Sequence, residues 1–143
     1  MCYSIGEVAN QTGITISTLR YYDREGMFPE IGRSNGGIRV FSETEIATLR
    51  VVECLKTAGM SIKDIKEFLR WCKEGDSSLQ KRREMFYKRL DEVRNQIATL
   101  ERTMHTLQYK CWYYDTAIAA GTEKAVKNLS EDEIPEDLRD FRI

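Results

Sequence analysis

Apolar residues recur at helical spacing near the start of the chain and predict two short helices joined by a tight turn over residues 4–26. Ser4 and Glu7 have the spacing of a capping box, in which each side chain satisfies a backbone amide at a helix start. Gly13 suits the left-handed backbone that a tight turn between helices often needs. The apolar positions, which we expect to face inward, are Ile5, Val8 and Ala9 on the first helix and Ile16 and Leu19 on the second.

Polar side chains occupy the other face of the second predicted helix, which Thr15 is placed to cap. Hydroxyl and guanidinium groups on a helix surface can contact DNA base edges and phosphate oxygens. The alternative is an ordinary helical hairpin in an all-α domain, because short patterns of this kind recur by chance. The outward residues are Ser17, Thr18, Arg20, Tyr21 and Arg24.

Residues 27–41 predict a β-hairpin after Pro29 has ended the helix. The strand candidates are residues 31–33 and 38–41, and the Asn-Gly-Gly sequence between them is a strong turn signal. Arg33 and Arg39 flank this turn, and such a wing can lie along a sugar-phosphate backbone. The alternative is an exposed hairpin whose arginines only aid solubility.

Two further helices are predicted, one from a Ser42/Glu45 capping box to about Thr57 and one that begins after Ser61. Lys63 remains outward, where it meets either phosphates or only solvent, and residues 74–77 form a loop signal. The expected buried positions are Ile46, Leu49, Val52 and Leu55, and then Ile62, Ile65, Phe68, Leu69 and Cys72.

A long heptad seam follows the loop, with apolar spacings that alternate between four and three and no Gly or Pro inside it. A lone helix would leave this stripe in water, and no second seam of that length exists in the chain to cover it. We therefore expect a homodimeric coiled coil. The seam positions are Phe86, Leu90, Val93, Ile97, Leu100, Met104, Leu107, Cys111, Tyr114 and Ile118.

Taken together, four segments closely resemble the MerR family of transcription regulators: TLRYYDREGMFP at 18–29, RSNGGIRVF at 33–41, SETEI at 42–46 and AGMSIKDIKEFL at 58–69. The expected fold is mainly α, with a winged helix-turn-helix head at 1–75, a coiled-coil dimerisation helix at 76–120 and an acidic tail at 121–143. The resemblance implies antiparallel pairing, and binding of a promoter whose overlong spacer is bent and untwisted so that RNA polymerase can engage. The expected DNA contacts are the outward residues of 17–24 together with Arg33, Asn35, Arg39, Phe41 (which replaces the more usual Tyr) and Lys63.

Charge alone does not predict DNA binding, because residues 1–75 carry ten Lys or Arg and ten Asp or Glu. The expectation survives only if the four arginines of the predicted interface share one face while the nearby acidic residues point elsewhere. Those acidic residues are Glu7, Asp23, Glu25 and Glu30.

The cysteines raise the question of a sensor. Cys54, with residues 112–123, resembles the branch of the family that answers aldehydes and other thiol-reactive electrophiles, and Arg50 and Lys56 are near enough in sequence to favour a thiolate. The alternative is that Cys54 is a small core residue. Cys111 lacks a second Cys or His after it, so we expect a core thiol and no metal site. His105 is expected to be an exposed helix residue.

Other classes of function find little support in the chain. No apolar run approaches the roughly 20 residues of a membrane span, the start lacks the features of a signal peptide, and scattered cysteines favour a reducing cytoplasm. No catalytic set or cofactor motif is present, so we expect neither an enzyme nor a cofactor. The competing interpretations are a coiled-coil adaptor that does not bind DNA and a metal-responsive MerR-type regulator.

Overall fold

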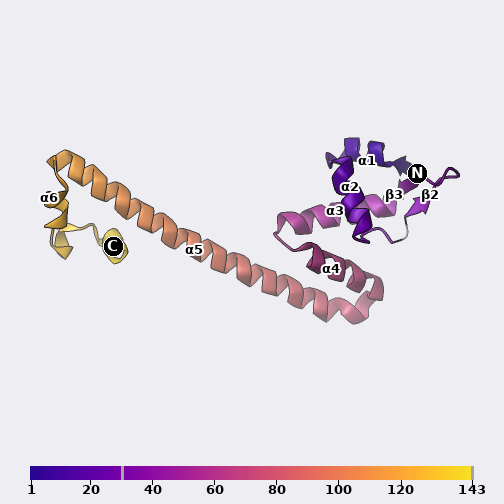
Figure 1. The fold of residues 1–143 in the computed structure, drawn as a ribbon. Helices are drawn as coiled ribbons and strands as arrows, with labels where there is room; N and C mark the ends of the chain where they lie inside the picture. Colours follow the sequence, from indigo (N-terminus) through magenta and orange to yellow (C-terminus); the bar gives the residue numbers. More distant parts are fainter. Residues whose placement is uncertain (30, 143) are drawn as a thin grey trace. The chain divides into compact units, whose positions relative to one another are not determined.

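The computed structural model describes residues 1–29 and 31–142 and divides into two compact units, Met1–Phe86 and a second that begins at Tyr87. The first unit opens with helices α1 (Ile5–Thr12) and α2 (Ile16–Arg24), drawn in indigo and violet (Figure 1). The predicted capping box is confirmed, since the Ser4 amide donates to Glu7 at 2.7 Å and the Glu7 amide donates to Ser4 Oγ at 3.3 Å. Gly13 ends α1 with φ of 74°, which favours glycine.

A small antiparallel sheet holds the wing, with strand order β1-β3-β2. Its strands are β1 (Cys2–Ser4), β2 (Gly32–Arg33) and β3 (Arg39–Ser42). The hairpin was predicted, but β1 was not, because three residues are too few to show strand periodicity. Tyr3 pairs with Phe41 in the register, so the first residues of the chain brace the inner strand of the wing.

Helices α3 (Glu43–Thr57) and α4 (Ile62–Glu74) complete the first unit and begin at the predicted caps, Ser42 and Ser61. Their buried stripes join those of α1 and α2 in one core, as predicted. Cys72 is an exception, because it is exposed and was expected inside. The fully or nearly buried core residues are Val8, Leu19, Tyr22, Met27, Phe28, Phe41, Ile46, Leu49, Val52, Leu55, Met60 and Ile65.

A 3-10 turn (η1, Gly75–Ser78) leads into α5, an unbroken helix of 42 residues from Leu79 to Ala120. The helix therefore starts one seam repeat earlier than the first predicted seam position, Phe86. Phe86 packs edge to face on Phe68, with ring centroids 5.2 Å apart, which ties the start of α5 to the first unit. None of the helices within the described residues is long and apolar enough to cross a membrane.

The tail folds back on the second unit as α6 (Glu123–Lys127) and two 3-10 turns, η2 (Glu131–Glu133) and η3 (Glu136–Phe141). Ile134 and Leu138 are buried against Tyr109, so the segment predicted as a polar tail has its own small core. His105, expected to be simply exposed, is half-buried because its ring stacks on Phe141 at 4.9 Å.

The heptad seam lies on the other side of α5 from this tail. At 100° per residue the seam positions cluster around one direction, while Tyr109, Trp112 and Tyr113 point to the opposite side. Val93 is half-buried and the other nine seam side chains are exposed in the single chain. The tail therefore leaves the seam uncovered.

Candidate nucleic-acid interface

The first turn of α2 gathers three hydroxyl groups. Thr15 Oγ1 accepts a hydrogen bond from the Thr18 amide at 3.2 Å, and it lies 3.0 Å from Ser17 Oγ and 2.8 Å from Thr18 Oγ1. Thr15 therefore caps the helix as predicted and orients both neighbours. Ser17 is exposed and Thr18 half-buried, so the hydroxyl of Ser17 is available at the start of the helix.

Farther along α2, Arg20, Tyr21 and Arg24 are exposed while Leu19 and Tyr22 are buried. The two arginines are one helical turn apart and so share a face. Tyr21 keeps 38% of its surface exposed beside them. This is the polar outer face that the sequence predicted.

Ile16 is a correction to that pattern. It was expected to face inward, but it is 39% exposed at the first position of α2. The first turn of a short helix lies at the margin of its packing contact, so helical spacing alone overestimated the burial there.

Tyr22 fixes α2 on α3 through a contact that the sequence did not predict. Its hydroxyl donates to Glu53 Oε1 at 2.6 Å and accepts from Lys56 Nζ at 3.0 Å, and this ammonium lies 5.5 Å from the ring centroid. Burial, and then the hydrogen bond to Glu53, raises the pKa of Tyr22, while Lys56 opposes that rise. The sequence did carry a signal for this contact. Tyr22 follows Leu19 by three residues and so shares its buried face, and a Glu and a Lys lie on the helix packed opposite.

The wing carries its two arginines as a cross-strand pair, since Arg33 and Arg39 lie opposite each other in the ladder. Arg33 Nη1 donates to the Gly37 carbonyl at 3.0 Å, and Asn35 at the tip is exposed. Gly37 has φ of 74°, so the turn needs glycine there. Arg39 forms an ion pair with Asp23 of α2, which links the wing to this helix.

This ion pair changes the expected distribution of charge in the head. Asp23 does not point elsewhere, because its carboxylate meets Arg39 directly. Glu25 pairs with Lys66 at 3.4 Å, and Glu7 is occupied by the cap of α1. Glu30 lies outside the described residues. The three acidic side chains that the structure describes, Asp23, Glu25 and Glu7, are thus engaged by neighbours of opposite charge or by a cap.

Phe41 was predicted as a DNA contact and is wrong in that role. Its side chain is only 1% exposed, and its ring packs edge to face on Phe28 with centroids 5.5 Å apart. A side chain enclosed in this way cannot reach a duplex. Phe41 instead holds β3 on the core and so positions Arg39, two residues earlier on the same strand.

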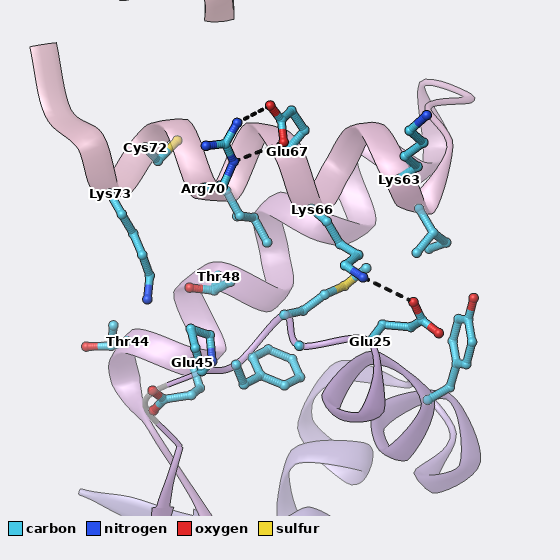
Figure 2. Close-up of a pocket in the computed structure, with 17 residues that line it drawn as sticks. Glu25, Thr44, Glu45, Thr48, Lys63, Lys66, Glu67, Arg70, Cys72 and Lys73 are labelled. Carbon is cyan, nitrogen blue, oxygen red and sulfur yellow. Dashed lines mark hydrogen bonds and ion pairs between the residues drawn. The ribbon is translucent and has the colours of Figure 1, made fainter. Parts of the chain in front are cut away.

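Lys63 lies at the start of α4, beside a groove of about 1070 Å³ between α2, α3 and α4 (Figure 2). The groove also includes Tyr21, so the structure brings these two predicted contacts to one place. Four basic residues of α4 line it, together with Met27 and Phe28. Those basic residues are Lys63, Lys66, Arg70 and Lys73.

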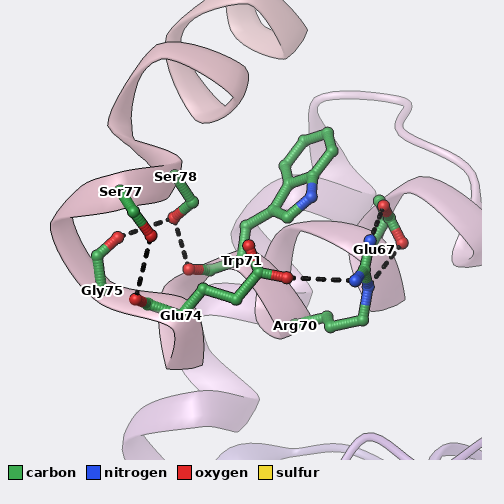
Figure 3. A network of polar contacts seen from close by, with 7 residues as sticks. All are labelled: Glu67, Arg70, Trp71, Glu74, Gly75, Ser77 and Ser78. Atoms are coloured by element: carbon green, nitrogen blue, oxygen red, sulfur yellow. Dashed lines mark hydrogen bonds and ion pairs between the residues drawn. The ribbon is translucent and has the colours of Figure 1, made fainter.

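The connection between α4 and α5 is held by backbone carbonyls rather than by packing alone (Figure 3). Ser78 is 1% exposed, and its hydroxyl donates to the carbonyls of Trp71 and, at 2.8 Å, Gly75. Arg82 of α5 also donates to the Gly75 carbonyl, at 3.0 Å. The start of α5 is thereby tied to the end of α4 within the first unit.

Cys54 is exposed on α3, so the alternative that it is a core residue does not hold for the single chain. Arg50 is exposed one helical turn earlier and shares its face. Lys56, the other predicted source of positive charge, is engaged by Tyr22. Over the part of the chain that the structure describes, no group of three or more His, Cys, Asp or Glu side chains could hold a metal ion.

Comparison with known proteins agrees with this geometry. Residues 3–71 match the family model described as "MerR HTH family regulatory protein", and residues 46–109 match "MerR, DNA binding". An uncharacterized HTH-type transcriptional regulator of Haemophilus influenzae is 40% identical over 136 residues, which cover 95% of this chain and 98% of that protein.

Solved structures give the same result. The crystal structure of HiNmlR, a MerR family regulator lacking the sensor domain, bound to promoter DNA, matches with a TM-score of 0.65 and 39% identity over 87% of this chain and 99% of that one. A MerR family transcriptional regulator from Bacillus thuringiensis matches with a TM-score of 0.62 and 38% identity over 78% of this chain and 97% of that one. The predicted resemblance and fold class are confirmed, and the chain belongs to the MerR family of DNA-binding transcription regulators.

Proposed function

We propose that this regulator acts as a homodimer joined along the α5 seam. The observation that carries the proposal is the stripe of exposed apolar side chains that runs from Phe86 to Ile118. Burying one large apolar side chain is worth very roughly 1.5 kcal/mol, so a seam of this length supplies a strong drive to pair. The tail covers only the opposite side of α5, where Tyr109 lies, so the seam remains available to a second copy.

The two α5 helices are proposed to run antiparallel, as the family resemblance implies. This orientation places the start of one α5 helix beside the end of its partner.

Each head of the dimer is proposed to place the outer face of α2 in a major groove, with the wing along the backbone. Two heads related by a twofold axis match a palindromic operator. We propose further that the bound promoter has an overlong spacer that the dimer bends and untwists, so that RNA polymerase is helped indirectly. That HiNmlR was crystallised on promoter DNA supports the binding of promoter DNA by this chain. Such a regulator acts where the promoter DNA is, which we take to be the cytoplasm.

Cys54 is proposed as the switch. The thiolate sulfur would add to the electrophilic carbon of an aldehyde, and the carbonyl oxygen would take up a proton, which gives an S-hydroxyalkyl adduct. Exposure of Cys54, and the guanidinium of Arg50 one turn away on the same face, support this step.

The competing functions fit less well. An adaptor without DNA binding rested only on the neutral charge of the head, and the family that the chain belongs to binds DNA. A metal-responsive regulator needs two or more protein ligands, and the described residues offer no cluster of three candidates.

A mobility-shift assay on promoter DNA tests DNA recognition by α2. Arg20→Ala should weaken binding by about 1–3 kcal/mol, or roughly 5- to 150-fold, while the oligomeric state stays that of the wild type. The matched control is Arg102→Ala, since Arg102 is an exposed arginine on α5 away from the seam. Equal affinities of the two variants would exclude α2 as the recognition helix.

A further inference from the structure

A second site lies at the far end of α5, away from the groove of the head. A polar pocket of about 330 Å³ forms there between α5, α6 and Arg142. It lies wholly within the second unit, between Tyr109 and Arg142. Its size is at the lower end of the range for small-molecule sites. The residues that line it are Tyr109, Lys110, Tyr113, Tyr114, Glu123, Val126, Lys127 and Arg142.

The pocket has more positive than negative charge. Lys110, Lys127 and Arg142 line it against a single carboxylate, Glu123. Lys127 pairs with Glu123 at 3.2 Å, which leaves two cations over. Among residues 1–29 and 31–142, no carboxylate lies within ion-pair distance of Lys110 or Arg142. A concave surface of one sign concentrates counter-ions of the other.

Tyrosine hydroxyls add neutral donors to these cations. Tyr109 lines the pocket, and its hydroxyl makes no hydrogen bond to any other residue in the described part of the chain. This hydroxyl is therefore free to donate to a ligand in the pocket. Tyr113 adds a second tyrosine side chain to the lining of the pocket.

We propose that this pocket binds a compact anion with at least two negatively charged oxygens. The groups that would hold it are the Lys110 ammonium, the Arg142 guanidinium and the Tyr109 hydroxyl, with Lys127 able to turn from Glu123. A guanidinium forms paired hydrogen bonds to the oxygens of a phosphate or a carboxylate, and charged hydrogen bonds of this kind are the strong ones. The volume limits the ligand to something small, so a phosphoryl group and a short dicarboxylate share the required chemistry.

Such a ligand would hold the tail against α5. Arg142 comes directly after η3, whose Phe141 stacks on His105, while Lys110 and Tyr109 belong to α5 itself. An anion that joins Arg142 to Lys110 therefore bridges the end of the tail and the long helix. Because every group lies within the second unit, the proposal does not depend on DNA contacts or on Cys54.

Isothermal titration calorimetry on the full chain tests the site with inorganic phosphate and with succinate, at constant ionic strength kept with chloride. We expect one of the two probes to bind at one site per chain, and the Lys110→Gln/Arg142→Gln variant to bind it at least about tenfold more weakly, because two charged contacts are lost. Lys124→Gln removes a charge from α6 outside the pocket and should bind within about twofold of the wild type.

The probe that binds more tightly, phosphate or succinate, shows whether the pocket prefers a phosphoryl group or a dicarboxylate. Tyr109→Phe should also weaken binding, by about threefold to tenfold, because it deletes only the hydroxyl. The proposal is overturned if neither probe gives heat beyond chloride, or if the double variant binds as the wild type does. Neither of these results would change operator binding, which is measured in parallel. The anion site and the DNA-binding function are therefore tested separately.

Discussion

Tyr22→Phe removes one oxygen atom from the contact between α2 and α3 and leaves the buried ring in place. The wild-type hydroxyl donates to Glu53 at 2.6 Å and accepts from Lys56 at 3.0 Å. Both partners are charged, and neither can follow the deleted oxygen into the core. The substitution therefore separates the polar contacts that hold α2 on α3 from the apolar packing of the Tyr22 ring.

The expected loss follows from the partners and their exposure. Hydrogen bonds to charged groups contribute about 1.5–3 kcal/mol each when buried. Glu53 is half-buried and Lys56 is exposed. In the variant, hydrogen bonds to water or a direct ion pair between Glu53 and Lys56 therefore recover part of this free energy. We therefore expect a destabilisation of about 1–3 kcal/mol for the two bonds together.

Urea unfolding followed by circular dichroism measures this loss at a fixed protein concentration, since a dimer's stability depends on concentration. The matched control is Tyr21→Phe, whose hydroxyl has no hydrogen-bond partner in the described chain and whose ring is exposed. If Tyr22→Phe is as stable as Tyr21→Phe, within about 0.3 kcal/mol, the hydroxyl does not hold α2 on α3.

The pH dependence gives an independent check on the same contact. The folded state raises the pKa of Tyr22 above 10.0, mainly through burial, and that of Lys56 above 10.5, mainly through the hydrogen bond to Tyr22. A raised pKa means that the folded state binds the proton more tightly, so stability falls as the pH rises above about 10. Tyr22→Phe should make that fall shallower.

Three other predictions concern the seam, the switch and the helix caps. Leu100→Asp puts a charge at the centre of the exposed stripe and should give a monomer by light scattering, whereas a dimer would exclude that stripe as the interface. Cys54→Ser should abolish induction of the target promoter by formaldehyde, while Cys72→Ser, also an exposed thiol, should preserve it; continued induction of the first variant would exclude Cys54 as the switch. Burial raises the pKa of Glu45, but the hydrogen bonds from Ser42 outweigh burial and hold that pKa below 4.5. Stability measured by urea unfolding should therefore fall as the pH drops below about 4.5. A stability that does not change with pH in this range would contradict the prediction.

The elements that could be predicted from the sequence are those that depend on local rules. Short stretches of neighbouring residues are enough to predict several features. These are the helix caps at Ser4, Ser42 and Ser61, the turn glycine Gly37 and the unbroken seam. The outer face of α2 followed from helical spacing in the same way. These features also carried the resemblance to the family.

What the sequence did not predict depends on contacts between distant residues. Phe41 was expected at the interface because of its place in the motif, yet the sheet register turns it inward against Phe28. The Tyr22 contact joins residues more than thirty positions apart, and no periodicity indicates such a pair. The end of the tail looked polar because Ile134, Leu138 and Phe141 are separated by charged residues, and only the fold shows that they pack with Tyr109.

Two copies of this chain are proposed to pair along α5 and present two heads to one operator. Sedimentation equilibrium at micromolar concentration, without and with a palindromic promoter fragment, measures both the pairing and the number of chains on the DNA. One chain has a mass of 16.7 kDa, so we expect roughly twice that mass for the free protein and two chains for each duplex. A free protein of 16.7 kDa, or one chain bound for each operator, would exclude pairing along α5.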